Sequence, residues 1–172
     1  MKLTIYFILS MMMFATGRDY KLQKNNLKIS IGKIYKIPED SFVFKGNYYS
    51  IEIFMINNTN SPIKFWTWSC SWTENWLTNS KNVDFYYPEC NSNVPIISTI
   101  NPNGKLIIKG KLEVIKENYT LMKNIRIGFI MIKEDEYNDY TDNFYEILGY
   151  KFKEKKDIYW SEPFNITEKN SN

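Results

Sequence analysis

The aromatic segment at residues 65–76 holds the side chains of this chain that could most directly contact a ligand. It reads Phe-Trp-Thr-Trp-Ser-Cys-Ser-Trp-Thr-Glu-Asn-Trp. Successive side chains of a strand point to opposite faces, so an extended segment puts Trp66, Trp68, Cys70 and Trp72 on one face. Such a face either packs into the core beside a disulfide or stands exposed as a flat platform for sugars or partner proteins. Both interpretations stay open, and Trp72 and Trp76, close to the loop expected after this strand, are the better candidates for exposure and binding.

A second candidate is the acidic run at residues 134–143, which reads Glu-Asp-Glu-Tyr-Asn-Asp-Tyr-Thr-Asp-Asn. Clustered oxygen ligands suit a hard cation such as calcium. The spacing does not match the EF-hand loop, which needs a glycine at its turn, so we expect a solvated loop and no metal site. Tyr137 and Tyr140 are of the type that recognition loops use, and they join the candidate binding residues.

A short basic run follows, with lysines at positions 151, 153, 155 and 156 around Phe152. Lysine at alternate positions is one way in which edge strands discourage aggregation. The run therefore predicts an exposed edge strand rather than a site for an anionic partner, since the acidic run just upstream offsets its charge.

The chain offers few groups for catalysis. It contains no histidine, which removes histidine-based triads, acid–base chemistry and metal sites. Its seven glycines are scattered and form no phosphate-binding loop. Cys70 and Cys90 are expected to form a disulfide, with two free thiols as the alternative. Carboxylate pairs stay open, because they meet in space and not in sequence. We expect a protein that is not an enzyme and uses no cofactor.

The elements that position these residues are short apolar runs separated by turn clusters, and most of the runs show period-two alternation. Clear runs lie at residues 27–31, 49–55, 83–87, 106–114 and 125–132. Their even spacing predicts an all-β protein, an immunoglobulin-like β-sandwich of about 8–10 strands. Gly110 suggests a bulge, and residues 125–132 suggest a strand buried on both faces. One short helix is expected at residues 142–148, capped by Asp142 and ended by Gly149.

Residues 1–17 have the pattern of a cleavable secretory signal. Lys2 precedes a short apolar run, and Ala15 and Gly17 place small residues at the −3 and −1 positions of a cut. The apolar run, at about 13 residues, is too short to span a bilayer. We therefore expect a single domain at residues 18–172, exported to the periplasm or the medium, with no membrane span after removal of the signal.

The charge balance limits the partners. The chain has 22 Lys and Arg against 19 Asp and Glu, and nearly all the cations are lysine. Weak charge and few arginines argue against a nucleic-acid partner. We expect an exported, non-enzymatic protein that binds another protein as an inhibitor, an immunity-type protein or an assembly component. The alternative is a carbohydrate or cell-envelope binding module that uses exposed Trp and Tyr side chains.

Overall fold

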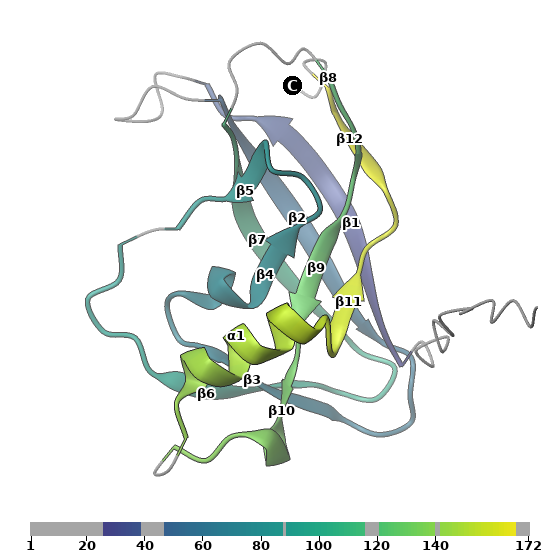
Figure 1. Cartoon of the computed structure of the whole chain (residues 1–172). Helices are drawn as coiled ribbons and strands as arrows, with labels where there is room; N and C mark the ends of the chain where they lie inside the picture. The colour runs from purple at the N-terminus through teal and green to yellow at the C-terminus, as the bar shows by residue number, and fades with distance from the viewer. Residues whose placement is uncertain (1–25, 39–46, 88, 116–120, 140–141, 168–172) are drawn as a thin grey trace, which may run out of the picture.

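The computed structural model describes residues 26–38, 47–87, 89–115, 121–139 and 142–167. In these ranges the chain forms twelve strands, one α-helix and two short 3-10 turns (Figure 1). The strands are β1 (Leu27–Lys36), β2 (Asn47–Asn57), β3 (Ile63–Trp68), β4 (Trp76–Thr78), β5 (Val83–Phe85), β6 (Pro95–Ile100), β7 (Lys105–Val114), β8 (Leu121–Ile125), β9 (Ile127–Ile130), β10 (Ile132–Lys133), β11 (Ile158–Trp160) and β12 (Phe164–Thr167). The helix is α1 (Phe144–Glu154), and the turns are η2 (Trp72–Asn75) and η3 (Glu134–Glu136). The prediction of an all-β sandwich with one short helix is confirmed, although the described residues form more strands than the 8–10 expected.

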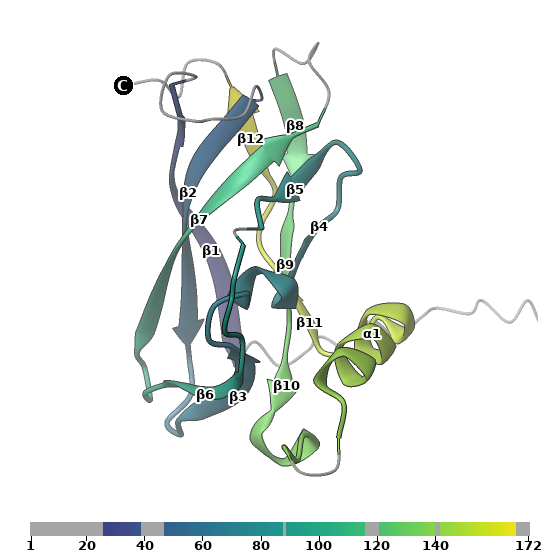
Figure 2. The same ribbon diagram turned by 90° about the vertical axis from the view of Figure 1, so that its left-hand side faces the viewer.

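The strands form two layers, which Figure 2 shows edge-on. One layer is the antiparallel sheet in the order β1-β2-β7-β5. The other is built around the consecutive strands β8, β9 and β10. On one side these pair with β12 and β11, and on the other with β4 and β3, beyond which lies β6. The many short alternating runs of the sequence thus divide between two sheets, each with one apolar face turned inward.

The run at residues 125–132 is buried as predicted, although it is divided among three strands. All four residues of β9 are buried. The chain changes its pairing partners at Arg126 and at Met131, which lie between strands. Gly128 permits close packing here, because a Cβ at this position would lie 3.0 Å from Ile158 and from Trp160.

The core has two parts. The main cluster fills the space between the layers, with Ile51, Phe65 and Phe129 among its fully enclosed side chains. A second cluster lies on the other face of the second layer, beneath α1, and its members are Trp68, Ile130, Ile132, Tyr137, Phe144, Leu148 and Ile158. The helix therefore covers the outer face of the second layer, as Figure 2 shows.

The helix differs from its predicted bounds. It begins after Asn143, whose side chain accepts a hydrogen bond from the Tyr145 backbone N–H, and it runs through Gly149 to Glu154. It ends at Lys155, which adopts the left-handed conformation. The edge strand predicted for the basic run is therefore wrong: these lysines lie in the last turns of a helix and just beyond it. Cations suit that end, where the unpaired carbonyl groups carry partial negative charge.

The bulge predicted at Gly110 is also wrong. Gly110 pairs with Ile51 in an unbroken register between β2 and β7. The irregularity of this sheet lies instead between Ile31 and Ile34, where β1 pairs with β2. A Cβ at position 110 would lie 3.0 Å from the ring of Trp72, so glycine there makes room for the indole.

Asn57 at the end of β2 holds the turn that separates β6 from β7. Its buried side-chain amide donates hydrogen bonds to the carbonyl oxygens of Ser61 (2.8 Å), Ile100 (3.0 Å) and Asn101 (3.1 Å). We expect Asn57→Ala to lower the free energy of unfolding by about 2 kcal/mol, because carbonyl groups in the interior lose their donor. Denaturant unfolding measures this. Asn60→Ala is the control, because Asn60 is exposed in the loop between β2 and β3. It should change stability by less than about 0.5 kcal/mol.

Candidate functional site

The aromatic segment singled out in the sequence is enclosed over most of its length. Trp66 and Trp68 on β3 face the second cluster, whereas Phe65 faces the main core, so the predicted alternation holds along the strand. It ends where the chain turns after β3. Trp72 on η2 packs against the main core, and the shared face predicted for Trp66, Trp68 and Trp72 is wrong for Trp72.

A buried asparagine holds η2 in this position. The Asn75 amide donates to the backbone carbonyl oxygens of Ile130 (3.2 Å) and Trp66 (3.4 Å), and its Oδ1 accepts from the Thr67 hydroxyl. Trp76 follows directly and enters the core opposite Phe129, because β4 pairs with β9. Trp76 is 3% exposed, so the expectation that it stands in solvent is wrong. Trp72 is half-buried.

The tyrosine candidates divide in a similar way. Tyr137 is buried between the rings of Trp66 and Phe144, at centroid distances of 5.0 and 5.3 Å. Its hydroxyl donates to Asp139, and burial, followed by the hydrogen bond to Asp139, raises the pKa of Tyr137 to about 12. Tyr137 therefore packs under the helix instead of standing out on a loop. Tyr140 lies outside the described residues.

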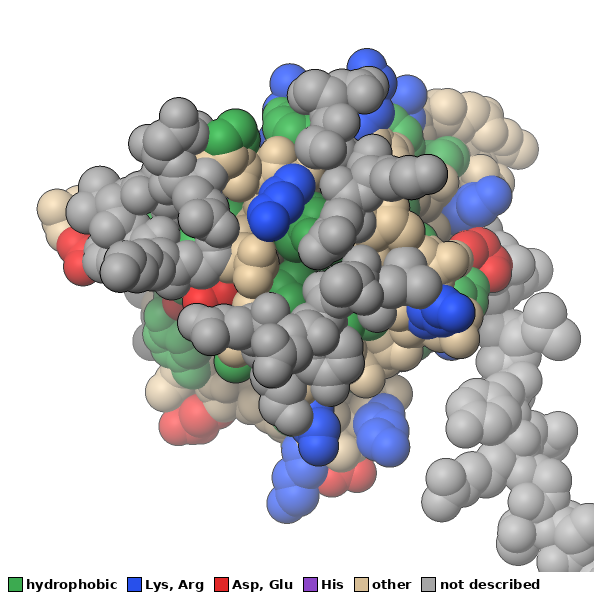
Figure 3. Space-filling model, turned by 90° about the horizontal axis from the view of Figure 1, so that it is seen from above, with side chains coloured by type: hydrophobic (Ala, Val, Ile, Leu, Met, Phe, Trp, Pro, Cys, Tyr) green, Lys and Arg blue, Asp and Glu red, His purple; other side chains and the backbone are tan. Residues whose placement is uncertain are grey.

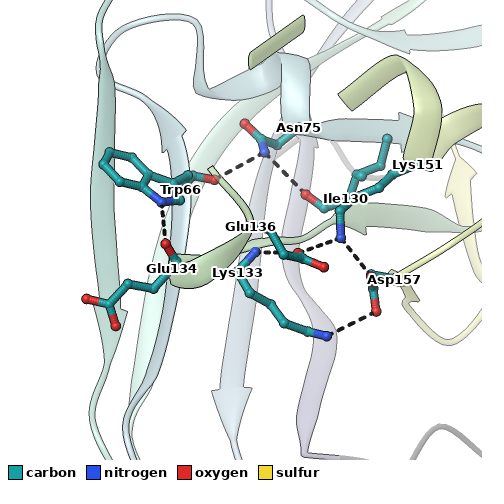
Figure 4. A network of polar contacts seen from close by, with 8 residues as sticks. All are labelled: Trp66, Asn75, Ile130, Lys133, Glu134, Glu136, Lys151 and Asp157. Carbon is teal, nitrogen blue, oxygen red and sulfur yellow. Dashed lines mark hydrogen bonds and ion pairs between the residues drawn. The ribbon is translucent and has the colours of Figure 1, made fainter. Parts of the chain in front are cut away.

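The carboxylates of Glu134 and Glu136, at the start of the acidic run, contact cations and a backbone N–H group. Glu136 Oε2 accepts from Lys151 Nζ at 2.6 Å, and Asp157 Oδ2 accepts from the same ammonium at 2.7 Å (Figure 4). Glu134 pairs with Lys64 on the surface at 3.0 Å. Among the residues that the structure describes, no group of acidic or cysteine side chains is arranged to hold a metal ion.

Cys70 and Cys90 form the predicted disulfide, with their Cα atoms 6.0 Å apart. The bond ties the turn after β3 to the loop that follows β5. Asn93 Oδ1 accepts hydrogen bonds from the backbone N–H groups of Cys70 and Ser71 and fixes the same turn. No helix in the described ranges has the length and apolar character that a bilayer crossing requires.

A groove that the sequence did not reveal lies between α1 and the segment that contains η2, β4 and β5. It has a volume of about 470 Å³ and is lined at its base by Trp76, Ile130 and Leu148. Four large apolar side chains stand about half exposed among its lining residues: Tyr87, Ile115, Tyr145 and Phe152. We call this feature the helix groove.

The helix supplies one wall of the helix groove through a regular stripe. Tyr145, Leu148, Gly149 and Phe152 follow the i, i+3, i+4, i+7 spacing that places residues on one face of a helix. A Cβ at Gly149 would meet no atom within 4 Å, so the glycine leaves space between the aromatic rings. The stripe is visible in the sequence, but the opposite wall comes from β4, β5 and η2, far away along the chain.

The helix groove also carries charge. Glu74 and Asp84 line it together with a single cation, Lys81. Burial, and then the charges of Asp84 and Glu74, raise the pKa of Tyr87 to about 12. Burial and the charge of Glu74 likewise raise the pKa of Tyr145. Glu74 Oε2 is enclosed and has no hydrogen-bond partner among the described residues. The helix groove therefore combines aromatic walls with an excess of negative charge.

Comparison with known proteins adds no family. No family model matches the sequence, and no curated protein matches it. Among solved structures, the chain is similar to a FixG-related protein from Vibrio parahaemolyticus, with a TM-score of 0.38 and 10% sequence identity over 84% of this chain and 98% of that chain. A similarity of this size assigns neither a family nor a function.

Proposed function

We propose that this is an exported, non-enzymatic protein that acts by binding another protein through the helix groove. The observation that carries the proposal is the convergence of four half-exposed apolar side chains on one groove. Aromatic side chains in a partly enclosed pocket with a polar rim are the usual centres of protein interfaces. As an inhibitor, an immunity-type protein or an assembly component, the protein would need no catalytic group.

The charges of the helix groove indicate what the partner presents there. Glu74 and Asp84 outnumber Lys81, and their charges, after burial, contribute to the raised pKa of Tyr87. Lys and Arg side chains are spread over the face that Figure 3 shows, and Asp and Glu side chains lie between them. We infer that the partner inserts an apolar segment that carries a lysine or arginine, because charge complementarity favours a cation beside two carboxylates.

Export rests on the leader-like residues 1–17 and on the disulfide. Disulfides persist in oxidising compartments outside the cytosol, and the Cys70–Cys90 bond fits such a compartment. The partner is therefore expected in the periplasm, in the cell envelope or outside the cell.

Carbohydrate binding is the second candidate. It is favoured by the rings of Tyr87 and Tyr145, which lie beside the carboxylates of Glu74 and Asp84 in the helix groove. Flat aromatic faces and carboxylate acceptors are what a sugar needs. The indoles that suggested a sugar platform in the sequence do not supply it, since Trp76 is buried and Trp72 packs against the core.

Site-specific photo-crosslinking tests the proposal. A benzophenone amino acid replaces Phe152, which is 57% exposed and lines the helix groove, and in a separate variant it replaces Tyr150. Tyr150 is also 57% exposed on α1 but is not a lining residue, so it is the matched control. We expect a single protein adduct from position 152, at a yield severalfold above that from position 150.

The adduct must also depend on the charge of the helix groove. Asp84→Asn keeps the Oδ1 that accepts from the Phe85 backbone N–H while it removes the negative charge, so it should lower the yield from position 152 severalfold. The proposal is contradicted if the two positions give equal yields, or if Asp84→Asn leaves the yield from position 152 unchanged. An adduct that contains saccharide in place of protein would show that the helix groove binds carbohydrate, the second candidate function.

A further inference from the structure

A second feature is an opening in the sandwich between β6 and β7. A turn at residues 101–104 joins these strands, and its length would suit a hairpin. They nevertheless pair with different partners, β6 with β3 and β7 with β2. The space between them is an apolar opening of about 310 Å³. Its lining includes Phe65, Trp72, Trp76, Ile96, Leu106 and Ile108.

The edge of β7 beside this opening is only half covered. β5 pairs with Leu112, Glu113 and Val114, and the Tyr86 N–H donates to the Lys111 carbonyl oxygen. Among the described residues, no strand pairs with residues 105–110 on that side. The hydrogen-bonding direction alternates along an antiparallel strand, so the N–H and C=O groups of Lys105, Ile107 and Lys109 point to the same side as those of Lys111. They form a ready template for another strand.

The facing edge of β6 also lacks protection. β6 is the outer strand of its sheet, and Ile96 and Ile97 are 40% and 43% exposed although they point to opposite faces. The strand contains no charged residue, and its proline, Pro95, stands at its first position. Natural edge strands are normally guarded by charges, bulges or internal prolines, so an apolar edge beside an apolar opening indicates a surface that is covered by a partner.

We propose that an extended segment of another protein adds as a strand to β7 along residues 105–109 and closes the opening between β6 and β7. The segment would continue the line of β5 down the same edge of the sheet. This second interface is distinct from the helix groove, so it goes beyond the function proposed above. We call it the strand-addition edge.

The residues of β7 define the chemistry of the segment. Leu106 and Ile108 face the interior, so the inward side chains of the added strand are apolar. The outward ones would lie beside Lys105, Ile107 and Lys109, which are exposed on the outer face. Glu52 pairs across from Lys109, which leaves one lysine in excess. Acidic side chains are therefore favoured at the outward positions, since opposite charges on neighbouring strands attract.

A second copy of this chain does not meet that description. Two other edge strands, β6 and β1, have no acidic residue to place beside Lys105 and Lys109. They read Pro-Ile-Ile-Ser-Thr-Ile and Leu-Lys-Ile-Ser-Ile-Gly-Lys-Ile-Tyr-Lys. The partner we infer is a different protein that offers a segment of alternating apolar and acidic residues.

The test uses labelled synthetic peptides and fluorescence anisotropy with the full-length protein. One end-capped peptide alternates valine with glutamate, a second alternates valine with lysine, and a third has the composition of the first in two blocks. We expect the valine–glutamate peptide to bind about tenfold more tightly than either of the others, which corresponds to about 1.4 kcal/mol. Asp84→Asn in the helix groove should leave this affinity unchanged.

Charge reversal supplies the decisive comparison. The double variant Lys105→Glu/Lys109→Glu should reverse the preference toward the valine–lysine peptide. Lys28→Glu/Lys33→Glu makes the same change of charge at exposed positions on β1, at the other edge of the sheet, and should not reverse it. The proposal is overturned if no peptide binds, if the block peptide binds equally well, or if both double variants behave alike. A dimer in sedimentation that the first peptide does not dissociate also overturns it.

Discussion

Trp76→Ala is expected to lower the free energy of unfolding by about 4 kcal/mol, which is typical when a fully packed aromatic side chain is removed. The indole lies between the layers, with its ring centroid 4.9 Å from that of Phe129 and 6.1 Å from that of Phe85. The substitution removes apolar contacts and leaves a cavity that the surrounding strands cannot fill. Urea unfolding followed by far-ultraviolet circular dichroism measures the change without relying on tryptophan emission.

Tyr150→Ala is the control for this prediction, because it removes an exposed aromatic ring from α1 and should change stability by less than about 0.5 kcal/mol. If Trp76→Ala costs no more than the control, the indole stands in solvent as the sequence suggested, and the sugar platform returns as the better hypothesis. Acrylamide quenching of the tryptophan emission gives a second, independent reading of the same question.

The position of Trp76 shows that strand periodicity predicts the facing of side chains only within one continuous strand. Alternation correctly separated Phe65 from Trp66 and Trp68, because these residues lie on one continuous strand. The rule ends at the turn after β3, where η2 redirects the chain. The position of Trp76 then depends on β4 pairing with β9, whose residues lie about fifty positions later in the sequence. Local patterns contain no information about that pairing.

The helix shows the same limit in another form. Gly149 looks like a stop signal, but glycine ends a helix when it adopts a positive φ, and here Lys155 does so instead. The helix continues because Leu148 and Lys151, three residues apart, both turn inward. A lysine in a buried position is rarely expected from sequence, since its charge must find partners. Those partners, Glu136 and Asp157, belong to different segments.

What the sequence did predict rests on strong local chemistry. The strand runs, the burial of most of residues 125–132 and the disulfide all follow from residue types at short spacing or from the cysteine count. The helix groove and the strand-addition edge depend on which strands adjoin. The strand-addition edge also depends on the lack of a strand beside residues 105–109 among the described parts of the chain. Sequence patterns indicate strands more readily than the gaps between them.

Among substitutions of polar residues, we expect the largest loss of stability at Lys151, whose ammonium group contacts two carboxylates. Its side chain is 3% exposed, and Nζ lies 2.6 Å from Glu136 Oε2 and 2.7 Å from Asp157 Oδ2. Asp157 adopts a positive φ, and its carbonyl oxygen accepts from the Met131 N–H, so the pair also ties the end of α1 to the β9–β10 junction. We expect Lys151→Ala to lower the free energy of unfolding by about 3 kcal/mol, because two partly buried carboxylates lose their common cation.

This loss should depend on pH in a definite direction. Partial burial raises the pKa of Glu136, but the hydrogen bonds from Lys151 and the Lys133 N–H outweigh it, so the pKa lies below the ordinary 4.5. The pKa of Asp157 is likewise held below 3.8, since Lys151 outweighs its burial. Depressed pKa values stabilise the fold above the unfolded-state pKa, and that stability is lost as the pH falls through the folded-state values.

The destabilisation by Lys151→Ala should therefore be full at pH 7 and should shrink as the pH falls below about 4.5, where protonated carboxyl groups no longer need the cation. Denaturant unfolding of the unsubstituted protein and of Lys151→Ala at a series of pH values measures this dependence. Lys133→Ala is the control, because its Nζ lies 3.7 Å from Asp157 and its side chain is largely exposed, so its loss should cost less than about 1 kcal/mol. A destabilisation by Lys151→Ala that stays constant across the acid range would mean that the lysine acts through the packing of its methylene groups alone, and not through its charge.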